Sequence, residues 1–522
     1  MVSVPEPLKL KTQYGHKIKT LDELAEAIGP RPRTQSVIMC HGTFDIVHPG
    51  HLRHMQYAKE KADLLIASVT ADEHIMKANH RPYVPQELRA SNLAALEMVD
   101  FVIVDPNATP IEHMRVLQPD FFAKGYEYFA NGVPPKTQEE LDTLADYGGE
   151  MVFTPGDIVY SSSAIIESSP PNLGIEKLLA LMDSEGISFD NLRNALHSLT
   201  GLKVHVVGDT IVDTYSYCTL LGATAKSPTF SVKHDYSDQF AGGAAVVARH
   251  MKTAGADVTF TTVLGNDDLR AYVIDDLEKA GVHTSAYIDA TRPTTHKERF
   301  ITDGYKMLQV DRVDNRSIGP RVMDAMTKSL RETTSDLVIF SDFRHGIFNR
   351  QTIGELKAAI PAGAIKAADS QVSNRWGNIL DFTDFDLITP NEREARFALG
   401  DQDSVVRPLA LELFREARAR FLILKLGERG VISYRTPGPQ PREFFTIDSF
   451  VEHLVDPIGA GDALLSYASL AVARTNNIVL ASILGALGAA VVCERQGNTP
   501  VSPQEVDEKI SALERRASFS QA

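Results

Sequence analysis

The segment that begins at His41, HGTFDIVHPGHLRHMQYAK, carries the densest set of groups that could do chemistry. His48 and His51 are three residues apart, so they share one face of a helix whose first turn Pro49 favours. A helix N-terminus attracts anions through its N–H groups and its dipole. Two imidazoles there can donate hydrogen bonds to phosphate oxygens as charge builds up in a transition state. Gly42 lets the backbone approach such a ligand closely.

Zinc binding is the alternative for this segment, because four histidines fall within fourteen residues: His41, His48, His51 and His54. No Cys or carboxylate cluster nearby completes a tetrahedral set of ligands. A single His at a helix start most often caps the helix or is solvated. The pattern therefore favours an anion site over a metal site.

The segment DPIGAGDA, which ends at Ala463, is the second chemistry-bearing run. Gly459, Ala460 and Gly461 can place successive backbone N–H groups at a helix start, which makes an anion hole for a transferring phosphoryl group. Asp462 then stands where it can accept a proton from an attacking hydroxyl. The same run could instead be an ordinary helix cap with an acidic residue in its first turn.

The elements that must position these groups follow an α/β rhythm, in which strand-like apolar runs alternate with helical patterns. We expect parallel sheets covered by helices in two doubly wound domains, the first Rossmann-like. The expected strands are 36–40, 64–69, 101–104, 121–123 and 151–154 in the first half, with helices over 87–99 and 111–117. In the second half they are 204–207, 258–263, 337–340, 386–388 and 422–424.

A breaker cluster, Ser168-Ser169-Pro170-Pro171, indicates where the first domain ends. The Leu-rich pattern over 175–196 predicts one or two connecting helices. We expect an N-terminal extension over 1–33, a first domain over 34–168, a helical linker over 169–199 and a second domain over 200–512.

The composition limits the kinds of binding partner and cellular compartment that fit this chain. The 522 residues include 53 basic and 68 acidic ones, and the net charge of −15 argues against broad nucleic-acid or membrane-surface binding. Cys40, Cys218 and Cys493 have no paired spacing, which favours a reducing compartment. The N-terminus lacks an apolar core of signal-peptide length, and the apolar stretch 478–493 is better interpreted as a buried helix than as a membrane span. A cytoplasmic protein is expected.

The first domain resembles the cytidylyltransferase-like nucleotidyltransferase superfamily over about residues 34–168. Its hallmark His-x-Gly-His element is present as His48-Pro49-Gly50-His51. Three further elements follow in the family's order: HRPYVPQELRASNLAALEMVD, PDFFAKGYEY and SSSAII. Glu127 stands where the family usually has Asp.

This resemblance implies transfer of a nucleotidyl group from a nucleoside triphosphate to a sugar 1-phosphate, with pyrophosphate released. It implies that His48, His51 and Lys124 stabilise the transition state, and that Mg²⁺ is held mainly by phosphate oxygens and water. The run FTPGDIVYSSSAII lacks the Arg typical of glycerol-phosphate cytidylyltransferases, so ATP is favoured over CTP. The nucleotide-binding residues implied are Gly42, Thr43, Phe44, Arg81, Arg89, Ser161, Ser162 and Ser163.

The second domain resembles the ribokinase-like carbohydrate kinases over about residues 200–510. The elements that carry the resemblance are GDTIVDTY, AGGAAVVARH, SDFRHGIF, TPNEREA, LKLGERG and DPIGAGDA. The resemblance implies a catalytic base at Asp462, an anion hole at Gly459, Ala460 and Gly461, ATP binding by Asn391, Lys425 and Gly427, sugar binding by Asp213, Gly242 and Gly243, and Mg²⁺ held through water at Glu394. Segments near 215–233 and 294–312 would form a small β lid, which in this family often joins two subunits into a dimer.

The sequence departs from the kinase pattern at two places. Val246 stands where the family commonly has Asn, and a Val cannot hydrogen-bond a hydroxyl, so the sugar differs from the usual substrates. Pro457-Ile458 replaces the small or hydroxyl residue that usually precedes Gly459, which adjusts the loop without removing the reacting groups.

Both domains occur fused in the bifunctional ADP-heptose synthases, which this chain resembles with the domain order reversed. The resemblance implies phosphorylation of a sugar similar to heptose 7-phosphate, followed by transfer of AMP to a sugar 1-phosphate. Two alternatives stay open. One is CTP-dependent synthesis of a CDP-sugar or CDP-polyol. The other is that one domain is catalytically degenerate and acts as a ligand sensor or a dimerisation module.

Overall fold

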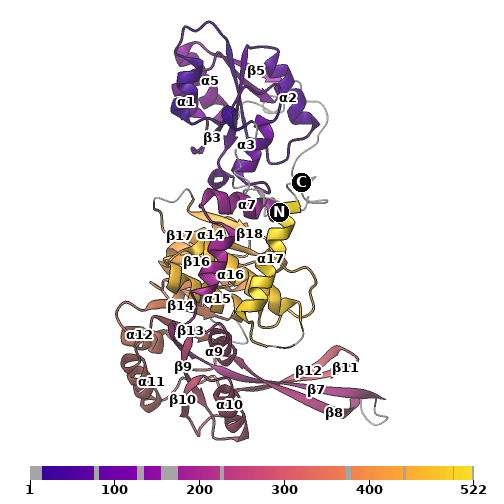
Figure 1. Cartoon of the computed structure of the whole chain (residues 1–522), viewed down its shortest axis with the longest axis vertical. Coiled ribbons are helices and arrows are strands. Elements are labelled where there is room, and N and C mark those ends of the chain that lie inside the picture. Colours follow the sequence, from indigo (N-terminus) through magenta and orange to yellow (C-terminus); the bar gives the residue numbers. More distant parts are fainter. Residues whose placement is uncertain are drawn as a thin grey trace, which may run out of the picture. The chain divides into compact units, whose positions relative to one another are not determined.

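The computed structural model describes residues 14–75, 82–125, 135–154, 174–223, 229–371, 378–438, 442–495, 497 and 499–519. Contacts divide the chain into two compact units, one up to Ser184 and the other over Glu185–Ser520 (Figure 1). The division falls between two helices of the expected joint. Helix α7 (Gly174–Ser184) belongs to the first unit, and α8 (Phe189–His197) belongs to the second.

The first unit is built on a five-stranded parallel sheet of order β3-β2-β1-β4-β5. The strands are β1 (Val37–Gly42), β2 (Leu64–Thr70), β3 (Phe101–Asp105), β4 (Phe121–Gly125) and β5 (Glu150–Thr154). The helices are α1 (Leu21–Ile28), α2 (Pro49–Lys59), α3 (Gln86–Ala94), α4 (Ile111–Leu117) and α5 (Pro135–Tyr147). The predicted Rossmann-like sheet is therefore confirmed.

Strand β1 shows why the sequences of these strands are continuous apolar runs. Ile38 and Cys40 pack into one buried cluster, whereas Val37 and Met39 pack into another. Because successive side chains of a strand point to opposite faces, a sheet covered on both faces must be apolar at every position. The helix expected over 87–99 was predicted too long: α3 ends at Ala94, and turn hydrogen bonds carry the chain to Val99.

The second unit contains a nine-stranded sheet of order β10-β9-β6-β13-β14-β15-β16-β17-β18. All neighbours are parallel from β10 to β16, and the last two strands are antiparallel. The strands are β6 (Lys203–Gly208), β9 (Asp257–Leu264), β10 (His283–Ile288), β13 (Leu337–Asp342), β14 (Ile365–Ser370), β15 (Leu387–Ile388), β16 (Phe421–Lys425), β17 (Val431–Arg435) and β18 (Phe444–Ile447).

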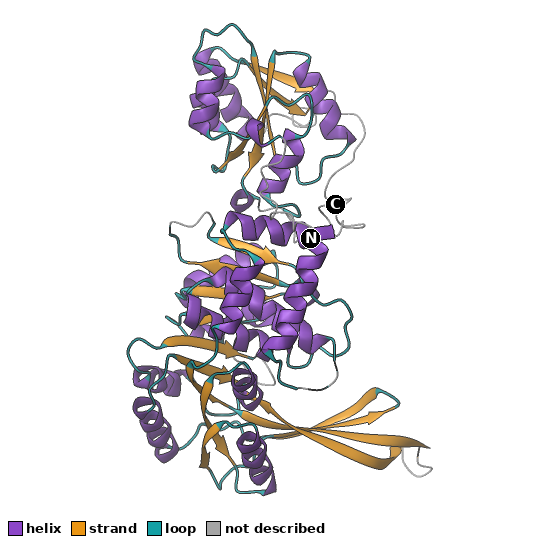
Figure 2. Ribbon diagram, in the orientation of Figure 1, coloured by secondary structure: helices purple, strands orange, loops and turns teal. Residues whose placement is uncertain are grey.

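Helices cover both faces of this sheet (Figure 2). They are α9 (Ala244–Thr253), α10 (Asp268–Lys279), α11 (Pro320–Glu332), α12 (Arg350–Ala359), α13 (Glu392–Leu399), α14 (Val406–Ala417), α15 (Ala460–Thr475), α16 (Ile478–Cys493) and α17 (Pro503–Phe519). Helix α16 coincides with the apolar stretch that was interpreted as a buried helix, and nearly all of its residues are buried. Among the described residues, no helix is long and apolar enough to cross a membrane.

A second, four-stranded sheet of order β12-β11-β7-β8 forms the expected lid and extends away from the main sheet of the same unit (Figure 2). Its strands are β7 (Thr210–Ala223), β8 (Phe230–Gly243), β11 (His296–Thr302) and β12 (Tyr305–Arg312). Strand β7 follows β6 almost directly, and β8 leads directly into α9. The lid and the carboxyl edge of the main sheet are thus connected at both ends of the first hairpin.

Candidate active sites

Polar residues gather at the carboxyl edge of the nine-stranded sheet. Asp209 directly follows β6, while Asp342, Asp369 and Lys425 lie in the final residues of β13, β14 and β16. Parallel strands present their carboxyl ends at one edge, which is where open α/β sheets bind ligands. The topology therefore brings together residues that are more than 200 positions apart in the chain.

Lys425 lies at the centre of one polar cluster at this edge. Its Nζ donates to both carboxylate oxygens of Asp369, at 3.0 and 3.1 Å. Burial alone would lower the pKa of this ammonium, but Asp369 and Glu394 outweigh it and raise the pKa. A Cβ built on Gly461 would come within 3.3 Å of Nζ, so the ammonium lies against the first turn of α15. Lys425 therefore places a positive charge beside the predicted anion hole.

Asp462 lies in the same first turn of α15, and the residue is only 8% exposed. Burial raises the pKa of this carboxyl to about 8, with a further upward contribution from Asp369 that Lys425 partly offsets. The helix begins directly after Gly459, whose φ of 85° is a left-handed conformation that L side chains rarely adopt. The first-turn N–H groups of a helix lack acceptors within the helix, so they can bind an anion.

Asn391 and Glu394 form a capping box at the start of α13. The Asn391 backbone N–H and side-chain amide donate to the two oxygens of Glu394 at 2.7 and 2.6 Å, and the Glu394 N–H donates to Asn391 Oδ1 at 2.9 Å. An isolated bridge pairs Asn391 with Lys425, which places this box beside the Lys425 cluster. Gly427, the remaining predicted ATP-binding residue, opens the turn after β16 with a φ of 64°.

The predicted sugar-binding residues lie where the lid joins the main sheet. Gly242 is directly beside Asp213, because a Cβ at Gly242 would come within 2.4 Å of Asp213 Oδ2. Arg299 on β11 donates to Asp213 Oδ1 at 2.6 Å. Gly243 has a φ of 63° and no room for a Cβ against the carbonyl of Asp209. Val246 follows in the first turn of α9 and is fully buried.

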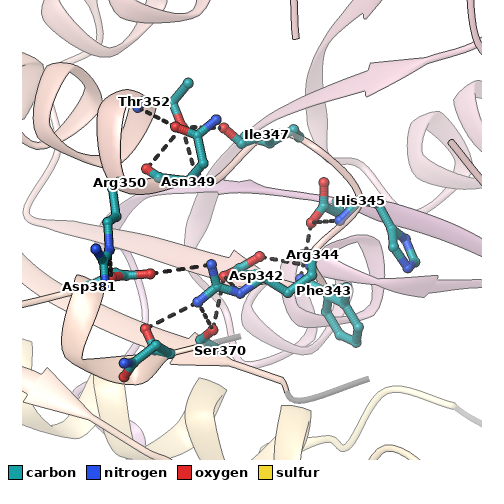
Figure 3. Close-up of polar contacts among 12 residues, drawn as sticks. Asp342, Phe343, Arg344, His345, Ile347, Asn349, Arg350, Thr352, Ser370 and Asp381 are labelled. Carbon is teal, nitrogen blue, oxygen red and sulfur yellow. Dashed lines mark hydrogen bonds and ion pairs between the residues drawn. The ribbon is translucent and has the colours of Figure 1, made fainter. Parts of the chain in front are cut away.

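The loop after β13 is fixed by a buried network (Figure 3). Arg344, at a left-handed φ of 61°, pairs through Nε with Asp342 Oδ2 at 2.8 Å and donates to Ser370 Oγ at 3.0 Å. Ser370 Oγ donates to Asp342 at 2.9 Å. Burial raises the pKa of Asp342 to about 7. The same loop is held from its other side by Asp209, which accepts the N–H groups of Phe343 and His345 at 3.0 and 3.2 Å.

In the first unit, the His48 and His51 rings stack with centroids 3.9 Å apart at the N-terminus of α2. His48 Nδ1 accepts the Gly50 N–H at 3.1 Å, and burial lowers the pKa of this imidazole. A neutral ring that accepts at Nδ1 carries its proton on Nε2, so His48 presents an N–H donor at the helix start. The backbone of Phe44 has a left-handed φ of 47°. The Phe44 ring packs edge-on against the His51 ring, with the two centroids 5.2 Å apart.

Arg89 on α3 is fully buried. Its guanidinium donates to the carbonyls of Thr43, Thr70 and Val84 and to the Asp72 carboxylate. These contacts fix the loop that follows β1, the loop to which Gly42, Thr43 and Phe44 belong. Binding of phosphate by Arg89 stays a prediction.

Lys124 lies at the end of β4, next to β1 in the sheet, and is thus on the same edge as the α2 N-terminus. Its ammonium forms an ion pair with Glu140 on α5. Burial raises the pKa of Glu140, although the Lys124 contact opposes that shift. Three predicted elements, Arg81, Glu127 and Ser161–Ser163, lie outside the described residues.

Several site residues were missed in the sequence. Asp369 follows the run IKAA, and Asp209 follows the run VHVVG, so an acidic residue at the end of a strand-like run was the available signal. Arg299 and Glu140 had no comparable signal, because their partners Asp213 and Lys124 lie 86 and 16 positions away. Over the described part of the chain, no group of three or more His, Cys, Asp or Glu side chains is arranged to hold a metal ion.

Comparison with known proteins agrees with the division into two domains. Residues 202–505 match the family model described as pfkB family carbohydrate kinase, and residues 39–168 match the model described as cytidylyltransferase-like. Among curated relatives, the chain is 28% identical to bifunctional protein HldE of Desulfatibacillum aliphaticivorans over 63% of this chain and 66% of that protein. It is 33% identical to bifunctional protein HldE of Syntrophotalea carbinolica over 27% of this chain and 28% of that protein.

The chain thus aligns with somewhat less than two thirds of the length of the first curated relatives. Among solved structures, phosphofructokinase-2 of Escherichia coli in complex with substrates and products superposes with a TM-score of 0.51 at 14% identity, over 60% of this chain and 100% of that chain. A point mutant of the same enzyme gives the same values. At this identity the likeness shows the fold of the second unit alone. The kinase model spans more than half of the chain, and we conclude that the chain belongs to the pfkB family of carbohydrate kinases, with a cytidylyltransferase-like domain preceding the kinase domain.

Proposed function

We propose that the chain is a bifunctional enzyme of nucleotide-sugar synthesis, in which the second domain phosphorylates a sugar with ATP and the first transfers a nucleotidyl group to a sugar 1-phosphate. The observation that carries the proposal is the buried Asp462 in the first turn of α15, beside the Lys425–Asp369 pair. A carboxyl with a pKa near the working pH, next to a helix N-terminus and an ammonium, suits transfer of a phosphoryl group to a hydroxyl.

In the kinase reaction, Asp462 removes the proton from the acceptor hydroxyl as its oxygen attacks the γ-phosphorus of ATP. The bond between that phosphorus and the β–γ bridging oxygen breaks, and ADP leaves. The first-turn N–H groups after Gly459 stabilise the charge on the transferring phosphoryl group, and Lys425 neutralises charge beside it. Asp213, Gly242 and Gly243 bind the sugar, and Asn391 and Gly427 contact ATP.

The chemistry of the donors around Glu394 fits Mg²⁺ held indirectly. Both oxygens of Glu394 already accept hydrogen bonds from Asn391. A carboxylate engaged in this way fits an outer role, in which it orients water on an ion that the ATP phosphates bind directly. When bound, Mg²⁺ would neutralise phosphate charge in both reactions.

In the first domain, an oxygen of the sugar 1-phosphate attacks the α-phosphorus of the triphosphate, and pyrophosphate leaves. His48, through its Nε2–H, and His51 stabilise the transition state at the start of α2. Lys124 does so from the adjacent strand, once the triphosphate competes with Glu140 for its ammonium. We assign triphosphate binding to Gly42, Thr43, Phe44, Arg81 and Ser161–Ser163, with Arg89 fixing the Thr43 loop or reaching phosphate itself.

The acceptor proposed for the kinase is a sugar phosphate similar to heptose 7-phosphate, and the nucleotidyl group proposed is AMP. The support is the similarity to proteins named bifunctional protein HldE, together with the cationic Arg299 beside Asp213. We also propose a cytoplasmic location, for which the three buried, unpaired cysteines are the support.

We further propose that two copies associate through the lid. Large apolar side chains are exposed on its strands, which is unusual for a surface facing solvent. They are Leu220, Leu221, Phe230, Tyr236, Tyr305 and Leu308, with exposures from 43% to 76%. Burying these side chains against a second lid would remove them from water.

The proposal is tested by two assays on the purified chain. Release of ADP is measured with ATP and a panel of sugars and sugar phosphates that includes heptose 7-phosphate, and release of pyrophosphate is measured with ATP or CTP and a panel of sugar 1-phosphates. Both activities should appear, with ATP preferred in the second assay. Activity with CTP alone would indicate CDP-sugar synthesis, and loss of one activity against every substrate would indicate a degenerate domain.

A further inference from the structure

His345 is a buried side chain that the proposed mechanism does not use. It lies in the loop after β13 and is 8% exposed. Nδ1 is fully buried, and the imidazole makes no hydrogen bond to any described residue. His205, His250 and His296 are also buried, but each of them forms a ring-nitrogen hydrogen bond to a protein group. An imidazole without such a partner is costly to bury, so it calls for a ligand.

The backbone of His345 is clamped on both sides. Its N–H donates to the Asp209 carboxylate at 3.2 Å, and its carbonyl accepts from Arg292 Nη1 at 3.2 Å. The next residue, Gly346, has a φ of 107° and no room for a Cβ against the carbonyl of Arg316. Figure 3 shows the imidazole directed away from the network of Asp342, Arg344 and Ser370. The backbone of His345 is thus fixed by its neighbours, whereas the imidazole makes no hydrogen bond to a described residue that would stabilise the loop.

The surroundings of the ring are those of the predicted sugar site. Burial lowers the pKa of the imidazole to about 3, and the charge of Lys297 on the lid, which is close enough to act on His345, adds to this shift. Lys297 pairs in register with Asp213 in the parallel β11–β7 ladder, so both side chains are on one face of the lid. The Asp209 carboxylate accepts the His345 N–H, and the Asp209 backbone carbonyl accepts the N–H of Ala244, which directly follows Gly242 and Gly243, at 2.9 Å.

We propose that His345 is a specificity-determining residue of the kinase site, which hydrogen-bonds a hydroxyl of the acceptor sugar through a ring nitrogen. The proposal rests on the proposed kinase function. The imidazole can supply a polar contact to the sugar, whereas the fully buried Val246 has no polar group to offer. Because the imidazole is uncharged, its hydrogen bond can orient the sugar without adding to the positive charge of Lys297 and Arg299. A sugar that lacks the contacted hydroxyl would leave the ring unpaired and bind less well.

The test compares three variants of the full chain: His345→Leu, which removes the polar atoms, His345→Asn, which keeps a hydrogen-bonding group near Nδ1, and His205→Leu, a matched control. His205 is also buried in the same unit, with 0% of the residue exposed against 8% for His345, but its ring bonds to Thr261 on β9. KM for the acceptor, KM for ATP and kcat are measured by ADP release with heptose 7-phosphate. Thermal unfolding is recorded for each variant.

The expected result is an acceptor KM about tenfold higher in His345→Leu, with KM for ATP unchanged and partial recovery in His345→Asn. The control should change only the unfolding temperature. An unchanged acceptor KM in His345→Leu would overturn the proposal, as would equal changes in the two KM values accompanied by the loss of stability seen in the control. If the wild-type chain releases no ADP with any acceptor of the panel, the kinase function fails and takes this proposal with it, and that outcome is distinct from an active enzyme indifferent to residue 345.

Discussion

The pH dependence of the kinase reaction follows from the environment of Asp462. A base must be unprotonated to accept the hydroxyl proton, and burial together with Asp369 raises the pKa of Asp462 to about 8. With that pKa, about one tenth of the molecules carry the active carboxylate at pH 7 and about nine tenths at pH 9. The kcat/KM of the kinase reaction, which reports ionisation of the free enzyme, should therefore rise about tenfold over this range and then level off.

The charges around Asp462 provide the perturbation. Asp369→Asn removes the neighbouring carboxylate that raises this pKa and releases Lys425 from its ion pair, and both changes favour the charged form of Asp462. The midpoint of the profile should move to lower pH. Asp384→Asn is the matched control, since Asp384 is half exposed and pairs with Arg418 instead.

The assay is single-turnover ADP formation at limiting ATP from pH 6 to 9.5, in buffers of constant ionic strength. A flat profile over this range would refute the assignment of Asp462 as a base with a raised pKa. A midpoint that stays in place in Asp369→Asn, or that moves equally in Asp384→Asn, would refute the electrostatic origin of the shift.

Four other outcomes are expected. Asp462→Asn should have a free energy of unfolding higher than that of the wild type by on the order of a few kcal/mol at pH 9, with a smaller difference toward pH 4. The reason is that the raised pKa of Asp462 in the folded state lowers the stability of the wild type as pH rises through this window. Thermal unfolding at several pH values checks this. Arg89→Lys should destabilise the first unit by about 2–3 kcal/mol and raise KM for the triphosphate, measured by denaturant unfolding and pyrophosphate release. Gly459→Ala should cost about 1 kcal/mol at its φ of 85° and lower kinase kcat, with pyrophosphate release unaffected. Leu308→Lys should convert the proposed dimer to a monomer in light scattering, and a mass unchanged by the substitution would contradict the lid interface.

Local patterns in the sequence predicted part of this fold. Periodicity placed all five strands of the first unit and five of the nine strands in the main sheet of the second, but it missed β10, β14, β17 and β18. The lid strands were expected from the family resemblance alone. The uncharged run from Ile478 to Cys493 gave a buried helix with those bounds. The strand expected over 386–388 is one residue shorter at its start and spans Leu387–Ile388. The helix after residue 87 was predicted too long because apolar spacing continues through the turn that follows Ala94.

The contacts within the site were harder to predict from the sequence, because the residues that meet there lie far apart along the chain. Motifs gave Asp462 and Lys425, but the partner of Lys425 is Asp369, which lies 56 positions away on another strand. The same holds for Arg299, which reaches Asp213 only because β11 pairs with β7. A motif shows which side chain can react, whereas the charge that tunes it depends on strand order, which one sequence does not determine.

The central claim is that two independent sites act in one chain, and a paired assay of Asp462→Asn tests it most directly. ADP formation with a sugar phosphate and pyrophosphate release with a sugar 1-phosphate are measured on the same sample of the full chain. We predict that ADP formation falls at least a hundredfold, as expected for removal of a general base, while pyrophosphate release is unchanged. Full ADP formation by this variant would contradict the account.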